Sequence, residues 1–165
     1  MRIVFTTLVA LLVLPVHAVA ANDVEKADAV LVIKSEKRLY LMKKGEVLAS
    51  YRAAFGAEPK GHKERQGDER TPEGRYTLGY KNGNSAYYKS IHVSYPNAED
   101  RRKARQRGYD PGGDIMIHGQ PNGWGWVWPV LQRISWTDGC IALSNENMDR
   151  VWEAVDPGIP IEIRP

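Results

Sequence analysis

The chain contains one cysteine, Cys140, which follows a threonine, an aspartate and a glycine at residues 137–139. A single thiol cannot form an internal disulfide, and in an oxidising compartment it is open to mixed disulfides and over-oxidation. One interpretation is a small buried hydrophobe, a common role of free cysteine. The other is a nucleophile, which needs an imidazole to take its proton and backbone amides to stabilise the developing oxyanion. The neighbouring glycine and an upstream His-Gly pair favour the nucleophile.

The best candidate for the base is His118, which ends the apolar segment 115–117 and is followed by Gly119. Strand ends are where a rigid scaffold presents side chains to a cleft. His62 lies in a charged segment and is expected to be exposed. His92 lies between two apolar residues that point to the other face of an alternating strand. It is therefore expected to be a surface or half-buried structural histidine, with a place in the site as the alternative.

The residues directly before the cysteine are candidates for the supporting groups. Gly139 permits a tight turn in which the backbone can approach a substrate. The amides of Gly139 and Cys140 are the expected oxyanion donors, with the amide and carboxylate of Asp138 beside them. The hydroxyl of Thr137 is expected to form a local hydrogen bond that fixes the turn. An ordinary turn is the alternative, and only its junction with the cysteine makes the segment specific.

The N-terminus has the pattern of an export signal. Arg2, an apolar run over residues 3–15 and small residues at 18–20 are typical of a cleaved signal peptide. The apolar run is shorter than the roughly 20 residues that span a bilayer. We therefore expect a signal peptide over residues 1–20 and an exported domain over residues 21–165. An uncleaved N-terminal anchor that leaves the domain outside the cytoplasm is the alternative.

Size and charge restrict the classes of function. Roughly 145 residues after the signal are enough for one domain with its own core. Arg2 is the only charged residue among the first twenty, so their removal lowers the net charge from +3 to +2. So small an excess does not indicate a nucleic-acid partner, and the sequence has no zinc-type Cys/His spacing or phosphate-binding glycine loop.

The hydrophobic pattern predicts a single, mainly β domain with a few helices. Strands are expected over residues 29–33, 38–42, 47–53, 74–78, 90–95, 114–118 and 159–163, with turns at 43–46 and 81–84 and a loop over 56–70. A helix is expected over residues 97–107, which begin with an asparagine and acidic residues and end with basic residues before a glycine. A second is expected over residues 145–155, where apolar residues recur at helical spacing.

These motifs resemble those of the L,D-transpeptidase catalytic domain (YkuD) family of bacterial cell-wall enzymes. The family has a His-Gly pair followed by a Ser/Thr-x-Gly-Cys motif, and here 17 residues separate His118-Gly119 from residues 137–140. Residues 67–76, Gly-Asp-Glu-Arg-Thr-Pro-Glu-Gly-Arg-Tyr, are similar to a third family motif. Residues 87–89 and 95–101 are similar to a branch of periplasmic murein enzymes that includes an amidase releasing a lipoprotein from peptidoglycan.

The resemblance implies a β-sandwich-like fold and a periplasmic location. It also implies that Cys140 is the nucleophile, that His118 is the base and that the Gly119 carbonyl orients the imidazole. The usual family motif is Ser-His-Gly-Cys-Ile/Val-Arg/Asn, so Asp138 stands in place of a histidine and Ala142 in place of arginine or asparagine. Losing the arginine or asparagine removes a polar group beside the substrate and leaves the acceptor open.

The function implied is a cysteine-dependent peptidoglycan L,D-transpeptidase, which forms a thioester with the third stem residue, releases D-alanine and transfers the acyl group to an amine. A hydrolytic L,D-carboxypeptidase, or an amidase that frees a lipoprotein, is the first alternative. A non-catalytic wall-binding module is the second. No metal or organic cofactor is expected, because a thiolate and hydrogen-bond donors suffice. The expected partners are stem peptides, or a wall-linked lipoprotein for the amidase, and a monomer without stable membrane insertion is expected after signal cleavage.

Five further side chains are candidates for contact with the substrate. Trp124 and Trp126 lie between the histidine and the cysteine, where a loop could cover the cleft. The alternative is a hairpin with one aromatic face packed on the core. Arg133 could hold a substrate carboxylate through paired hydrogen bonds. Tyr88 and His92 complete this set.

Overall fold

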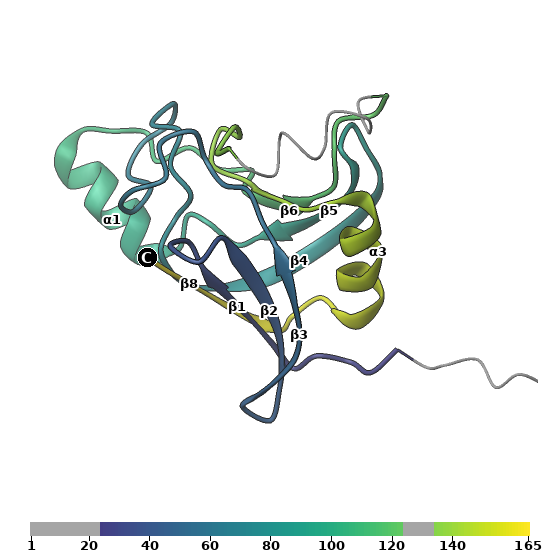
Figure 1. The fold of residues 1–165 in the computed structure, drawn as a ribbon. Coiled ribbons are helices and arrows are strands. Elements are labelled where there is room, and N and C mark those ends of the chain that lie inside the picture. The colour runs from purple at the N-terminus through teal and green to yellow at the C-terminus, as the bar shows by residue number, and fades with distance from the viewer. Residues whose placement is uncertain (1–23, 124–133) are drawn as a thin grey trace, which may run out of the picture.

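The computed structural model describes residues 24–123 and 134–165 (Figure 1). The described part is mainly β, as the sequence predicted. Its strands are β1 (Ala29–Ile33), β2 (Arg38–Lys43), β3 (Glu46–Arg52), β4 (Gly74–Ser85), β5 (Tyr88–Val93), β6 (Met116–His118), β7 (Ile141–Ala142) and β8 (Pro160–Arg164). Its helices are α1 (Ala98–Arg107) and α3 (Asn145–Ala154).

The eight strands form one sheet in the order β3-β2-β1-β8-β4-β5-β6-β7. The β1–β8 and β6–β7 pairs are parallel, and the other pairs are antiparallel. The long strand β4 pairs with β8 through its first half and with β5 through its second half, and so joins two parts of the sheet. Beyond β3, Ala54 and Ala142 exchange two backbone hydrogen bonds of 2.9 Å. The two ends of the strand order are therefore linked, and the sheet bends around one core.

Alternating apolar side chains build that core. In β1, Val30 and Val32 are buried, and Ile161 and Ile163 occupy the same positions in the neighbouring strand β8. Helix α3 lies alongside the sheet and contributes the apolar face that its spacing predicted (Figure 1). Burying a side chain of this size stabilises the fold by roughly 1.5–3 kcal/mol.

Both predicted helices form, and each begins at a capping residue. The Asn97 side chain accepts hydrogen bonds from the amides of Glu99 and Asp100, while the Asp100 carboxylate accepts one from the Asn97 amide. This reciprocal capping box satisfies amides that have no partner within the helix. Helix α1 ends at Gly108 in the left-handed conformation, and Ser144 caps α3 by accepting from the Asn147 amide at 3.1 Å.

Three local predictions differ from the structure. The turn expected at residues 81–84 is wrong, because β4 continues to Ser85 and two register shifts accommodate its polar residues. The strand expected over residues 114–118 is shorter, since it covers only Met116–His118. The two-residue strand β7 was not predicted, because a segment that short shows no periodicity.

Candidate active site

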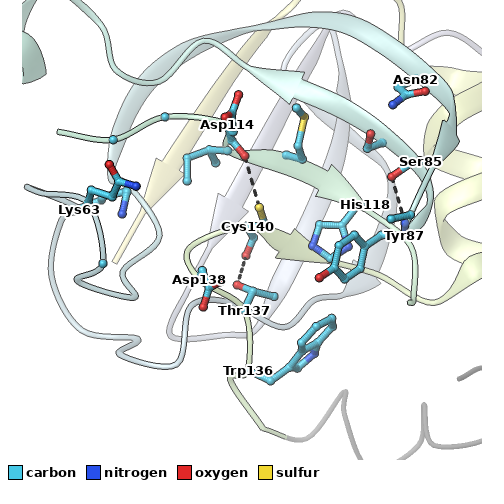
Figure 2. Close-up of a pocket in the computed structure, with 18 of the residues that line it drawn as sticks. Lys63, Asn82, Ser85, Tyr87, Asp114, His118, Trp136, Thr137, Asp138 and Cys140 are labelled. Atoms are coloured by element: carbon cyan, nitrogen blue, oxygen red, sulfur yellow. Dashed lines mark hydrogen bonds between the residues drawn. The ribbon is translucent and has the colours of Figure 1, made fainter. Parts of the chain in front are cut away.

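The parallel pairing of β6 and β7 brings the two central candidates into one pocket. His118 is the last residue of β6, and Cys140 directly precedes β7. Because Ile117 pairs with Ile141, Cys140 lies beside Met116 on the neighbouring strand. Both candidate side chains line a pocket of about 950 Å³ (Figure 2).

The imidazole of His118 is held in one orientation by a backbone carbonyl. Its Nδ1 lies 2.6 Å from the carbonyl oxygen of Gly119. Since a carbonyl only accepts hydrogen bonds, Nδ1 carries the proton and Nε2 is left as the base. Burial lowers the pKa of His118 to about 4, although the hydrogen bond to Gly119 opposes that shift. The imidazole is therefore neutral at pH 7 and can accept a proton.

The backbone approaches too closely at Gly119 to allow a side chain. A Cβ atom there would lie 2.7 Å from the Asn145 side-chain oxygen and 2.9 Å from the Cβ of Tyr88. The same Asn145 oxygen accepts a hydrogen bond from the Gln120 amide at 2.8 Å. Helix α3 therefore fixes the segment whose carbonyl orients the imidazole.

The thiol of Cys140 is also neutral at pH 7. Burial raises its pKa, the Met116 amide lowers it, and the negative charge of Asp138 raises it further. The sulfur donates a weak hydrogen bond to the Asp114 carbonyl, with an Sγ–O distance of 3.6 Å (Figure 2). A neutral thiol beside a neutral imidazole suits general-base chemistry, in which the proton moves as the sulfur attacks.

The turn before the cysteine is fixed by Thr137 and Gly139. The buried Thr137 hydroxyl donates to the Cys140 carbonyl at 2.8 Å and accepts from the Gly139 amide at 3.2 Å. Gly139 has a φ of +123°, and a Cβ atom there would lie 2.5 Å from the Arg70 carbonyl oxygen. Glycine is therefore required both by conformation and by space. The role of the Gly139 amide as an oxyanion donor stays a prediction, since this amide bonds to Thr137.

The upstream motif at residues 67–76 supports this turn from behind. The Asp68 carboxylate accepts hydrogen bonds from Lys63 at 2.9 Å and from the amides of Glu64, Arg65 and Arg70 at 2.7, 3.1 and 3.2 Å. Burial opposes ionisation of Asp68, but these donors outweigh it and hold the pKa of the carboxyl below its usual range. The ionised carboxylate thus fixes the loop that carries the Arg70 carbonyl against Gly139.

Two aromatic rings that were not predicted to belong to the site cover the histidine. The Tyr87 ring lies 4.7 Å from the His118 ring, and the Trp136 ring lies edge-on to it at 5.9 Å. Both rings line the pocket (Figure 2). They help to keep water from His118, which is only 4% exposed. Trp136 lies next to the cysteine motif and Tyr87 within the motif at residues 87–89, so each had a signal in the sequence.

The candidate substrate contacts have different positions. The Tyr88 hydroxyl donates to the Asp149 carboxylate of α3 at 2.9 and 3.1 Å, and Tyr88 is not among the residues that line the pocket. His92 stacks on Tyr80, with ring centroids 5.1 Å apart, just outside that lining. Trp124, Trp126 and Arg133 lie outside the described residues.

The two departures from the family motif also have different positions. Asp138 is exposed and lines the pocket beside the cysteine. Ala142 is fully buried in the pair that links the ends of the sheet, away from the pocket lining. In residues 24–123 and 134–165, no cluster of three His, Cys, Asp or Glu side chains is placed to hold a metal ion. Within the same residues, no helix is long and apolar enough to cross a membrane.

Comparisons with known proteins agree with this geometry. The family described as the L,D-transpeptidase catalytic domain, YkuD, matches residues 27–163. A curated Escherichia coli K12 protein, "Putative L,D-transpeptidase YafK", is 31% identical over 147 residues, which cover 81% of this chain and 52% of that protein. The chain therefore spans about half the length of this curated relative.

Solved structures give the same result for the fold. The helical cell shape determining protein Pgp2 of Campylobacter jejuni has a TM-score of 0.62 and 28% identity, and the match covers 84% of this chain and 48% of that one. Bd1075 of Bdellovibrio bacteriovorus has a TM-score of 0.58 and 20% identity, with 84% and 48% covered.

Proposed function

Because the chain belongs to the L,D-transpeptidase catalytic domain (YkuD) family, we propose that it is a cysteine-dependent peptidoglycan L,D-transpeptidase acting in the periplasm. One observation carries this proposal. A neutral imidazole, fixed through Nδ1 by the Gly119 carbonyl, shares a pocket with the thiol of Cys140. The substrate would be a stem peptide whose third residue is followed by D-alanine.

In the proposed reaction, His118 Nε2 takes the proton of Cys140 as the sulfur attacks the carbonyl carbon of the third stem residue. The bond to the nitrogen of D-alanine then breaks, and the imidazolium gives its proton to that leaving amine. A thioester remains on the sulfur. An acceptor amine attacks the thioester and loses a proton to the imidazole, and the departing sulfur becomes a thiol again.

The fixed tautomer matters for both halves of this cycle. With its proton held on Nδ1 by the Gly119 carbonyl, the ring presents the basic Nε2 to the thiol and later to the acceptor amine. The Met116 amide lowers the pKa of Cys140 and so supports the thiolate as the proton leaves. The amides of Gly139 and Cys140, with the amide of Asp138 beside them, are the proposed donors to the oxyanion.

Asp138 favours a second candidate, in which water resolves the thioester. Its exposed carboxylate lies in the pocket, at the position where the usual family motif has a histidine. A carboxylate at this point can accept a hydrogen bond from a water molecule and so hold it near the thioester. The second candidate is therefore an L,D-carboxypeptidase, or an amidase that frees a wall-linked lipoprotein.

Mass spectrometry of reaction products separates these candidates. The purified protein is incubated with disaccharide-tetrapeptide, with and without a free D-amino acid, beside the Cys140→Ala variant. A dimer or an exchanged product that is lost in the variant supports the transpeptidase, and tripeptide alone supports the hydrolase. If neither appears, lipoprotein-linked peptidoglycan is the next substrate. Full turnover by Cys140→Ala would overturn both candidates.

A further inference from the structure

The sheet face that carries the histidine continues beyond the pocket lining. Ser90 on β5 pairs with His118 on β6, and His92 pairs with Met116. Directly paired residues share a face of a sheet, as do residues two apart on one strand. His92 therefore projects from the same face as His118, and it is one strand removed from Met116, the neighbour of Cys140.

The next strand extends this face with polar and aromatic side chains. Asn82 on β4 pairs with Ser90, and its side chain lines the same pocket as His118 and Cys140 (Figure 2). The Tyr80 ring stacks on the ring of His92 with an angle of 10° between the planes. A row of side chains thus crosses the sheet from Cys140 through Met116 and His92 to Tyr80.

The aromatic pair is a preformed, accessible platform. Tyr80 is 56% exposed, although its ring is held against a second ring. At Gly79 a Cβ atom would lie 2.8 Å from the Nδ1 atom of His92, so the backbone of β4 leaves room for that ring. A flat ring that is fixed and exposed can bind another flat surface with little loss of side-chain entropy.

We propose that Tyr80 and His92 form a subsite for the N-acetylated amino sugar to which the stem peptide is attached. Sugar rings present a flat face of C–H groups that packs on an aromatic ring, and their hydroxyl and acetamido groups need polar partners. Asn82 and Ser90 supply an amide and a hydroxyl beside the platform. This inference rests on the proposed function, because it takes Cys140 as the point where the third stem residue reacts.

The length of the row suits this ligand. Cys140 directly precedes β7, and from β7 to β4 there are three strand spacings of about 4.8 Å, or roughly 14 Å. Three residues of extended peptide span about 10 Å, and the link to the sugar covers the remainder. The sugar would therefore reach Tyr80 when the third residue reaches the sulfur.

Calorimetric titration with two ligands tests the subsite. Disaccharide-tetrapeptide and the same tetrapeptide without sugar are titrated into the full chain carrying Cys140→Ala. We expect the disaccharide form to bind more tightly, and Tyr80→Ala to weaken it three- to ten-fold while leaving the free peptide unchanged. Tyr80→Phe should retain the affinity. Tyr109→Ala, at an exposed tyrosine outside the lining of the catalytic pocket, is the matched control and should have no effect.

Two results would overturn the subsite and leave the proposed function intact. These are equal affinity of the two ligands for the parent protein, and unchanged affinity of Tyr80→Ala for the disaccharide form. Failure of both ligands to bind would overturn the subsite together with the proposed function. Alkylation of the thiol with iodoacetamide, in variants that retain Cys140, verifies that Tyr80→Ala leaves the catalytic pocket folded.

Discussion

Replacing Gly139 with alanine tests whether the cysteine turn depends on its fit against the upstream loop. The new Cβ atom would lie 2.5 Å from the Arg70 carbonyl oxygen and 3.2 Å from a methyl carbon of Ile115. The φ of +123° costs an alanine about 1–3 kcal/mol, and relieving the overlap costs about 1–3 kcal/mol more. Together these make a loss of about 2–6 kcal/mol. For a domain of this size we expect the Tm to fall by roughly 5–20 °C.

Alanine substitutions at two other glycines measure separately the cost of the backbone conformation and the cost of the steric overlap. Gly158 has a φ of +98°, and a Cβ atom there would have no neighbour within 4 Å, so alanine carries only the backbone cost. At Gly56, φ lies outside the left-handed range, but a Cβ atom would lie 2.0 Å from the Glu69 carbonyl oxygen. The Gly56→Ala variant therefore isolates the cost of contact.

The assays are differential scanning calorimetry and the rate at which iodoacetamide alkylates Cys140. We expect Gly139→Ala to lower the Tm more than Gly158→Ala does, and to change the alkylation rate because the turn must move. In Gly158→Ala, Cys140 should be alkylated at the same rate as in the parent protein, since Gly158 lies in the turn before β8, far from Cys140 along the chain. If Gly139→Ala has the same Tm as Gly158→Ala, and its Cys140 is alkylated at the same rate as in the parent protein, the reasoning about this contact is refuted.

Four further predictions concern the protonation of the site. Burial raises the pKa of Cys140, so alkylation should be slower than that of free cysteine at pH 7 and still rising above pH 9; a plateau between pH 5 and 8 would contradict the neutral pair. The pKa of His118 is about 4, so kcat/KM should fall only as the pH drops through about 4, and an acid limb near pH 6.5 would contradict this. Tyr87→Ala should expose His118 and shift the acid limb of kcat/KM to a pH higher by about one unit or more, whereas Tyr87→Phe should leave it unchanged. NMR titration of the imidazole measures this pKa directly, and an unchanged pKa in Tyr87→Ala would contradict the prediction. Asp138→Asn should lower the pKa of Cys140 and speed alkylation at pH 8 by about two- to four-fold, and slower alkylation would contradict its assigned electrostatic effect.

Much of the fold could be predicted from local pattern. Alternation in β1 and the capping residues of α1 and α3 each identify an element without knowledge of its neighbours. Strand β7 could not be predicted in this way, because its two residues form a strand only through pairing with β6 and with Ala54. The link that joins the ends of the sheet is likewise a property of contacts between distant residues.

The candidate site was predictable where a motif fixes the chemistry. The sequence identified His118 and Cys140 as candidates, and the fold places both in one pocket. The choice between Tyr87 and Tyr88 was not predictable, because it depends on the hairpin backbone. Tyr88 adopts a φ of +67° and turns toward α3, which leaves Tyr87 over the histidine. The distance from Tyr80 to the nucleophile depends in the same way on strand order.

The buried carboxylate of Asp68 shows a further limit of sequence reasoning. Its motif was recognised as a resemblance, but its physical role needed the geometry. One carboxylate gathers three backbone amides and Lys63, and the loop that it fixes carries the carbonyl that packs against Gly139. The motif at residues 67–76 therefore acts on the cysteine motif through the backbone.

Intact-protein mass spectrometry tests the central claim most directly. The protein is mixed with disaccharide-tetrapeptide, quenched in acid and digested to locate any adduct. We predict a mass gain equal to the muropeptide less D-alanine, carried as a thioester by Cys140, absent in Cys140→Ala and much reduced in His118→Ala. Turnover of the same substrate with no adduct on Cys140, and with activity retained by Cys140→Ala, would contradict the claim.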